Sequence, residues 1–167
     1  MIAELIRKKA DKLPVAWLIR LGNFWSPFRG AGIKIIHATP DYRHMIVQMK
    51  LKWFNRNYVG THFGGSLYAM TDPFYMMMFI NNLGPDYIVW DKSACIDFLK
   101  PGRGTVTVHF RLTDELVDDV KQKADEFGKT VFELPVEIKD ENDEIIAKVN
   151  KTIYVRKKSH ATSRNEK

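Results

Sequence analysis

The spacing of apolar side chains along the chain separates helix-like from strand-like segments. Residues 2–21 carry apolar side chains near one face at helical spacing, with an interruption or a new start at Pro14, and Gly22 ends the predicted helix. Two shorter runs, 32–37 and 43–51, mix apolar and polar residues on either side of a turn that contains a proline. These two runs predict a β-hairpin.

The central part of the chain, from Gly64 to about Leu83, is nearly uncharged apart from Asp72. It is long enough for about five helical turns, so it predicts a helix that is apolar on most sides and must be enclosed by other elements. Four later segments, rich in β-branched and aromatic residues, have strand length and can enclose it: 87–99, 104–112, 130–139 and 144–156. A short helix or helical turn is predicted between the second and third of these strands, at 114–125.

The order of these elements predicts the fold class. A hairpin, a buried central helix and four antiparallel strands are typical of the hotdog arrangement, an α+β fold in which a curved antiparallel sheet wraps a long helix. Other α+β folds share the same periodicity. Because 167 residues fit one compact domain, we predict a single hotdog domain over 1–157, with an extra N-terminal helix at 1–22, and a disordered polar tail at 158–167.

Composition narrows the classes of function. A formal charge of +6 suits nucleic acid, an anionic membrane surface or a phosphorylated ligand, but much of it lies at the chain ends. No regular alternation of basic and aromatic residues indicates a nucleic-acid platform, so we expect no nucleic-acid partner. No segment approaches the roughly 18 uncharged apolar residues that span a bilayer, and the start does not resemble a secretory signal. We therefore expect no membrane insertion and a cytoplasmic location.

The single cysteine, Cys95, argues against an internal disulfide framework and a cysteine-based zinc site. No two histidines stand at a metal-binding helical spacing, so we expect no metal.

A glycine pair, Gly64 and Gly65, stands where a polar loop runs into the predicted central helix. Backbone N–H groups at a helix start lack partners, and the helix dipole favours negative charge there, so the pair can polarise a carbonyl group. The alternative is that glycine only permits close packing. Asp72, about two turns later, predicts either an acid–base group or a salt bridge or hydrogen bond across a subunit interface. Pro73 removes an N–H from the helix and predicts a kink beside this carboxylate.

These residues resemble the hotdog-fold acyl-CoA thioesterases. The phenylacetate-type branch has an asparagine, three glycines and an acidic residue at fixed intervals, which are matched here by Asn57, Gly60, Gly64, Gly65 and Asp72. The histidine of that branch falls on Phe63, and His62 lies one place earlier, a departure that bears on any catalytic role of His62.

A closer likeness is to the hotdog branch known as tetrameric acyl-CoA thioesterase or domain of unknown function. The run Gly60–Tyr68 matches throughout the Gly-Thr-x-Phe-Gly-Gly-Ser-Leu-Tyr sequence that opens the central helix in that branch, and residues 90–94 and 100–103 also resemble it. The resemblance covers roughly residues 20–156.

The resemblance implies hydrolysis of acyl-CoA thioesters by a homodimer or a dimer of dimers, with no cofactor beyond the coenzyme A of the substrate. The implied catalytic residues are Asp72 as general base or nucleophile, the Gly65 amide as the group that polarises the carbonyl, and Asn57 as the residue that orients water or substrate. The implied substrate-binding residues are His62, Phe63, Gly64 and Ser66.

Alternatives remain open at several of these positions. Asn57 is equally well suited to form a turn, and a lone loop histidine such as His62 is often structural. Lys100 and Arg103 flank a Pro-Gly turn and either are solvated or meet coenzyme A phosphates. Two other functions fit the same fold: a hydratase or dehydratase of acyl-CoA chains, and a protein that binds acyl-CoA without turnover.

Overall fold

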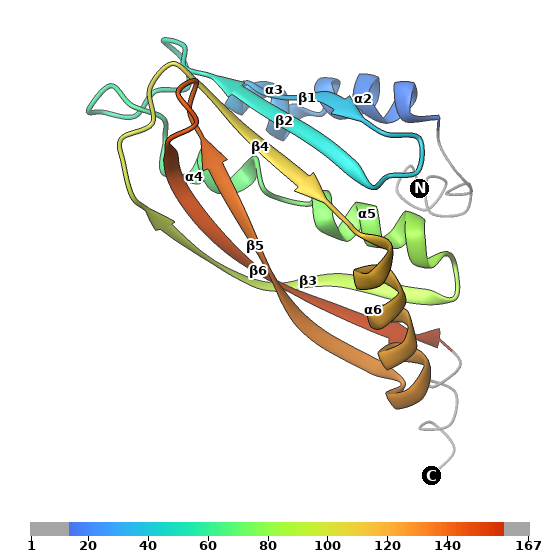
Figure 1. Ribbon diagram of the computed structural model, residues 1–167. Coiled ribbons are helices and arrows are strands. Elements are labelled where there is room, and N and C mark those ends of the chain that lie inside the picture. Colours follow the sequence, from blue (N-terminus) through green and yellow to red (C-terminus); the bar gives the residue numbers. More distant parts are fainter. Residues whose placement is uncertain (1–13, 159–167) are drawn as a thin grey trace.

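The computed structural model describes residues 14–158, in which a curved six-stranded antiparallel sheet wraps around two short central helices (Figure 1). The strand order is β1-β2-β4-β5-β6-β3. The strands are β1 (Ile33–Ala38), β2 (His44–Lys50), β3 (Tyr87–Phe98), β4 (Thr105–Arg111), β5 (Lys129–Lys139) and β6 (Ile145–Lys157). The helices are α2 (Val15–Phe24), α3 (Ser26–Ala31), α4 (Gly64–Ala69), α5 (Phe74–Leu83) and α6 (Asp114–Phe127). This architecture confirms the predicted α+β hotdog fold.

All six strands lie within one residue of their predicted bounds, and α6 covers the helix predicted at 114–125. The reason is visible in β2, where Met45, Val47 and Met49 are fully buried and the residues between them are not. A strand with one buried face alternates in this way because successive side chains point to opposite sides.

The N-terminal helix is confirmed only in its second part. The first part of the prediction, residues 1–13, lies outside the described residues, as does 159–167 of the predicted tail. Helix α2 starts directly after Pro14 and runs past Gly22. A Cβ atom at Gly22 would lie 2.7 Å from the Cδ1 atom of Ile35, so this glycine allows the helix to pack on β1 and does not end it.

The predicted continuous helix over 64–83 is wrong: the chain forms two helices, α4 and α5, with a turn between them. Pro73 cannot donate a backbone hydrogen bond. In the preceding turn, both the N–H and the hydroxyl of Thr71 donate to the carbonyl of Tyr68, which closes α4. Asp72 consequently lies in the turn between the helices, and its peptide bond to Pro73 is cis. The kink predicted at Pro73 is thus a complete break.

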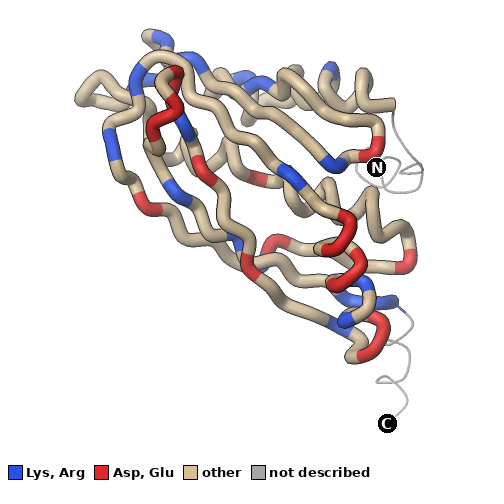
Figure 2. Tube along the Cα trace, in the orientation of Figure 1, with Lys and Arg blue, Asp and Glu red and all other residues tan. Residues whose placement is uncertain are grey.

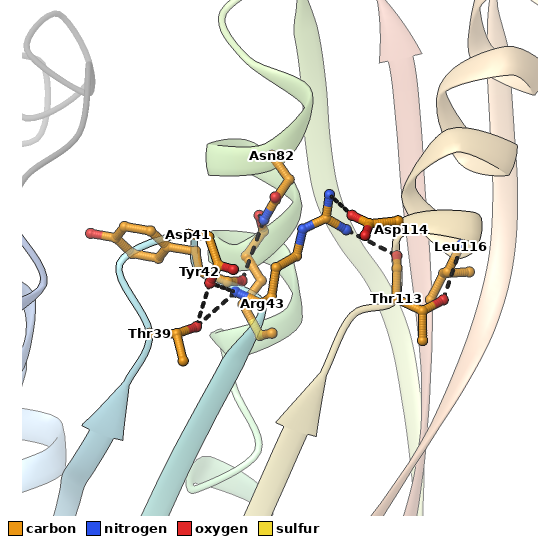
Figure 3. Close-up of polar contacts among 9 residues, drawn as sticks. Thr39, Asp41, Tyr42, Arg43, Asn82, Thr113, Asp114 and Leu116 are labelled. Atoms are coloured by element: carbon orange, nitrogen blue, oxygen red, sulfur yellow. Dashed lines mark hydrogen bonds and ion pairs between the residues drawn. The ribbon is translucent and has the colours of Figure 1, made fainter.

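The β1–β2 turn ties the start of α6 to the end of α5 (Figure 3). Arg43 donates from Nη1 to the carbonyl of Thr113 (2.9 Å) and pairs through Nη2 with Asp114 (3.0 Å). On the opposite side of the turn, Asn82 of α5 donates to the carbonyl of Tyr42 (3.3 Å). These contacts hold three segments that are distant in sequence together at one end of the sheet.

The sheet is continuous, but one pair of neighbouring strands shares few paired residues. Strands β4 and β5 share only two residue pairs, Thr107 with Lys139 and Val108 with Ile138, and then diverge. Helix α6 connects the diverging ends and packs its apolar face against β5 and β6 (Figure 1). The sheet therefore consists of two three-stranded halves, β1-β2-β4 and β5-β6-β3.

Candidate functional site

Asn57 organises the loop that leads into α4. Its Oδ1 atom accepts hydrogen bonds from the N–H groups of Val59 and Thr61 (3.1 and 3.0 Å), and its Nδ2 atom donates to the Thr61 hydroxyl and the His62 carbonyl (2.9 and 3.2 Å). An asparagine side chain has two donors and two acceptor sites, so all of them are used within the loop. This geometry favours the turn-forming interpretation, and the predicted contact of Asn57 with water or substrate stays a prediction.

His62 lies beneath the loop and is 3% exposed. Its Nε2 atom is 3.2 Å from the carbonyl oxygen of Gly104, and its backbone N–H donates to the carbonyl of Gly102. Burial lowers the pKa of His62 below its usual range, against the opposing effect of the Gly104 carbonyl. A neutral imidazole that donates from Nε2 leaves Nδ1 as an acceptor, and this atom is buried without a partner in the described residues. The position supports the structural interpretation of His62.

The glycine pair begins α4, as the sequence predicts. Within residues 14–158, the N–H groups of Gly64 and Gly65 have no hydrogen-bond partner, and Phe63 caps the helix without a side-chain bond. Both glycines also allow close packing, because a Cβ atom would lie 2.9 Å from the Phe98 ring at Gly64 and 2.5 Å from the Phe63 ring at Gly65. The two interpretations of the pair, polarisation of a carbonyl group and close packing, are therefore compatible. Because the glycines lack Cβ atoms, the rings of Phe63 and Phe98 pack close to two backbone N–H groups that have no partner in the described residues.

A shallow hollow of about 280 Å³ lies beside this helix start. It contains two of the residues that the resemblance implies for substrate binding, Phe63 and Ser66. The other lining residues come from α3 and from the loop after β2: Gly30, Ala31, Phe54, Asn55 and Arg56. Asn55 joins these two segments, because it donates to the carbonyl of Ala31 and accepts from the N–H of Lys52.

Asp72 meets a buried lysine that sequence analysis did not identify as part of a site. The carboxylate Oδ1 atom of Asp72 lies 2.9 Å from Nζ of Lys151, and the same Nζ lies 3.1 Å from Oδ2 of Asp91. The Lys151 side chain is 1% exposed, Asp91 is 17% exposed and Asp72 is 44% exposed. The ring of Tyr68 is 5.6 Å from the ammonium group. We call Asp72, Asp91 and Lys151 the charged cluster.

Alternation along β6 was the signal for Lys151. Val149, Lys151 and Ile153 occupy the same face of the strand, and all three are buried. In the sequence, Lys151 stands between the polar residues Asn150 and Thr152, and lysine is almost never buried without a partner. For both reasons this stretch looks like an exposed strand end. Asp91 lies in the Trp90–Ala94 run that the resemblance includes, but it had no assigned role.

Burial controls the charges of this cluster. It raises the pKa of Asp91 to about 6, assisted by the neighbouring carboxylate of Asp72, while the positive charge of Lys151 opposes the change. Burial alone would lower the pKa of Lys151, but the hydrogen bond to Asp72 and the two negative charges outweigh it and raise the pKa above its usual value. Lys151 is therefore charged at neutral pH, and Asp91 changes from its protonated to its ionised form at about pH 6.

The glycine pair and Asp72 lie at opposite ends of α4. Six residues at 1.5 Å per residue separate the ends by about 9 Å. Within one chain, the backbone at Gly65 and the turn that carries Asp72 are therefore separated by about the length of this helix.

Charge is unevenly divided along the chain (Figure 2). Residues 14–71 contain seven lysines and arginines but only one acidic residue, Asp41. Acidic residues gather in the later part, notably on α6. The loop and the glycine pair thus belong to a stretch of the sequence with more basic than acidic residues, but in space the carboxylate of Glu141 lies beside Gly104, whose carbonyl contacts His62. No group of histidine, cysteine and acidic side chains in residues 14–158 can hold a metal ion, and no helix there has the length and apolarity to cross a membrane.

Known structures share this fold. A protein of Pseudomonas aeruginosa, PA5026, described as a probable thioesterase, is 21% identical and aligns with a TM-score of 0.78 over 87% of this chain and 97% of its own. The thioesterase HI1161 of Haemophilus influenzae is 16% identical, with a TM-score of 0.62 over 87% of this chain and 92% of its own. The protein smu.793 of Streptococcus mutans, solved with acetyl-CoA, is 20% identical, with a TM-score of 0.54 over 75% of this chain and 89% of its own.

At these identities the structural comparisons establish the hotdog fold, and they agree with the resemblance found in the sequence. A comparison with curated proteins finds no match. The family described as a domain of unknown function, DUF4442, matches residues 16–155, which run from the second residue of α2 to two residues before the end of β6. The chain is therefore a member of the DUF4442 family and has the hotdog fold.

Proposed function

We propose that the protein hydrolyses acyl-CoA thioesters at a site formed by two copies of the chain. The observation that carries this proposal is the position of Asp72. Its carboxylate forms an ion pair with the buried Lys151, and its side chain is still 44% exposed. Most surface carboxylates are not fixed in this way. A carboxylate that is both oriented and accessible is suited to act as a general base.

In the proposed reaction, the Gly65 N–H of one copy donates to the thioester carbonyl oxygen, where negative charge develops. Asp72 of the other copy removes a proton from water, and the water oxygen attacks the carbonyl carbon. The carbon–sulfur bond then breaks, and the thiolate of coenzyme A takes the proton from Asp72. The two groups are assigned to different copies because α4 separates Gly65 from Asp72 within one chain.

The edge strand β3 supports a dimer. Within residues 14–158 it pairs with β6 on one side only, and it carries exposed apolar residues, among them Trp90 and Phe98. A long edge strand with exposed apolar side chains is a template for pairing with another chain. A homodimer, or a dimer of dimers, would place Phe98 and the adjoining Gly64 at the shared surface.

Charge and fold support an acyl-CoA substrate. The excess of cations in residues 14–71, with Arg56 lining the hollow beside α4, suits an anionic ligand. The Streptococcus mutans neighbour of the same fold was solved with acetyl-CoA. The buried position of His62 argues against a hydratase or dehydratase, because that reaction needs an accessible histidine beside an acid.

A thiol-release assay with short, long and aryl acyl-CoAs tests the proposal. The wild-type protein should release coenzyme A from at least one class, and Asp72→Asn should reduce kcat by about 100-fold or more, the lower range for loss of a general base. The control is Asp118→Asn on the exposed face of α6, which should not change the rate. Native turnover by Asp72→Asn would remove Asp72 from the mechanism. Binding of a non-hydrolysable thioether analogue without thiol release would identify a binding protein.

A further inference from the structure

A lysine occupies a core position in the middle of the sheet. On the inner face of β6, Lys151 stands between Val149 and Ile153, positions that an apolar residue would normally fill. Taking a charge out of water costs several kcal/mol, and an apolar residue in place of a buried ion pair is often neutral or stabilising. The position therefore indicates a use for the charge itself.

The sheet is built to accommodate this lysine. The β3–β6 register shifts between Asp91 and Ser93, a β-bulge that places Asp91 opposite Ile153 and the small residue Ala94 opposite Lys151. A bulge re-aims the side chains next to it, and here it leaves room for the long side chain of Lys151 while turning Asp91 toward its end.

The charged cluster has one accessible member. Both carboxylate oxygens of Asp91 are buried, the Lys151 side chain is 1% exposed, and Asp72 is 44% exposed. Within residues 14–158, the charged groups that face Lys151 are Asp72 from the α4–α5 turn and Asp91 from β3, and α4 presents the ring of Tyr68. Asp91 cannot touch a substrate from this position, so any influence of Asp91 on the surface must pass through Lys151 and Asp72.

We propose that Lys151 and Asp91 are positioning residues for Asp72. Lys151 orients the Asp72 carboxylate, and the charge of Asp91 determines how strongly the Lys151 ammonium neutralises the negative charge of Asp72. When Asp91 is protonated, the ammonium group neutralises Asp72 alone. When Asp91 is ionised, two carboxylates share one ammonium, and Asp72 keeps more negative charge for taking a proton from water. The kinetic consequence rests on the proposed hydrolysis, whereas the coupling between the two carboxylates does not.

Titration of Asp91 tests the coupling without any substrate. Carboxyl carbon NMR should give an Asp91 midpoint at about pH 6, because burial raises its pKa to that value. The midpoint should fall in Asp72→Asn, which removes a neighbouring negative charge, and rise in Lys151→Met, which removes the positive one. Asp97→Asn, an exposed position on the same strand, is the control and should leave the midpoint unchanged. A midpoint that stays at the wild-type value in Asp72→Asn would overturn the proposal.

The rate of hydrolysis tests the consequence. In the wild-type protein, kcat should rise as the pH passes through about 6. In Asp91→Asn this rise should be absent, with kcat at pH 8 roughly tenfold below wild type and KM unchanged, because the general base has lost negative charge. The double variant Lys151→Met/Asp91→Asn contains no unpaired buried charge, so it should fold and have a low kcat at every pH.

Each outcome separates the two proposals. Asp91→Asn with the wild-type pH profile, or a double variant with native kcat, would overturn the positioning roles. If the wild-type protein hydrolyses no acyl-CoA while the NMR midpoints shift as expected, the proposed function fails and the coupling within the charged cluster stands.

Discussion

The two ends of α4 differ in how they are built. At its start, the glycine pair is formed by neighbouring residues, and its donors are backbone N–H groups that any sequence would supply there. Beyond its end, the charged cluster joins side chains from the α4–α5 turn, β3 and β6. The glycine end therefore depends on local conformation, and the charged end depends on the whole sheet.

The two ends of α4 also differ in the strength of their electrostatic interactions. Groups at the glycine end lie near water, which screens their interactions, whereas Lys151 and Asp91 interact in a low-dielectric interior where each charge matters more. Substitutions in the charged cluster should therefore change stability as well as activity, and substitutions at the glycine end should change mainly activity.

The largest effect is expected for Lys151→Met. Removal of the ammonium leaves Asp91 buried without a positive partner, which should lower the free energy of unfolding by about 3–5 kcal/mol at pH 8. The loss should be smaller at pH 5, where Asp91 is protonated. Urea denaturation at both pH values measures it, with the exposed Lys148→Met on the same strand as control. Equal losses for Lys151→Met and Lys148→Met would show that the buried charge of Lys151 contributes no more to stability than an exposed lysine does.

A smaller effect of opposite sign is expected for Asp91→Asn. The pKa of Asp91 is raised to about 6 in the folded protein, above its value in the unfolded chain, so the wild-type protein loses stability as the pH rises through that interval. Asparagine does not ionise. The variant should match wild type near pH 4 and exceed it by on the order of 2 kcal/mol above pH 7, because Asp72 still pairs with Lys151. A variant less stable than wild type at pH 8 would contradict this sign.

The smallest change in stability is expected at the glycine end, for Gly65→Ala. The added Cβ meets only the ring of Phe63, an exposed side chain that can move, and alanine favours the helix by up to about 1 kcal/mol. The free energy of unfolding should therefore change by less than about 1 kcal/mol, while kcat falls because the displaced ring crowds the amide. Phe63→Ala/Gly65→Ala should recover activity, and a failure to recover it would show that the methyl group itself blocks the site.

The glycine end and one of the three residues of the charged cluster, Asp72, could be predicted from the sequence. The strands and the run Gly60–Tyr68 could be predicted because alternation and local motifs are written in consecutive residues. The break between α4 and α5 was predicted only as a kink, since the effect of Pro73 depends on how Thr71 closes the turn before it. Asp72 stood out as a lone carboxylate.

The partners of Asp72 could not be found in the same way. Asp91 and Lys151 are separated from it by 19 and 79 positions in the sequence and become neighbours only through the β3–β6 pairing. Strand alternation places Lys151 on the inner face, but the low frequency of buried lysine argues for the opposite assignment. The β-bulge that turns Asp91 inward leaves no mark in the sequence.

The narrow join between β4 and β5 has a mechanical consequence. With two residue pairs across it, this line has the fewest backbone hydrogen bonds in the sheet, so a relative rotation of the two halves would break the fewest bonds here. Such a rotation would change the curvature of the sheet over α5. The curvature of the sheet would then be a property of the scaffold and not of any single side chain.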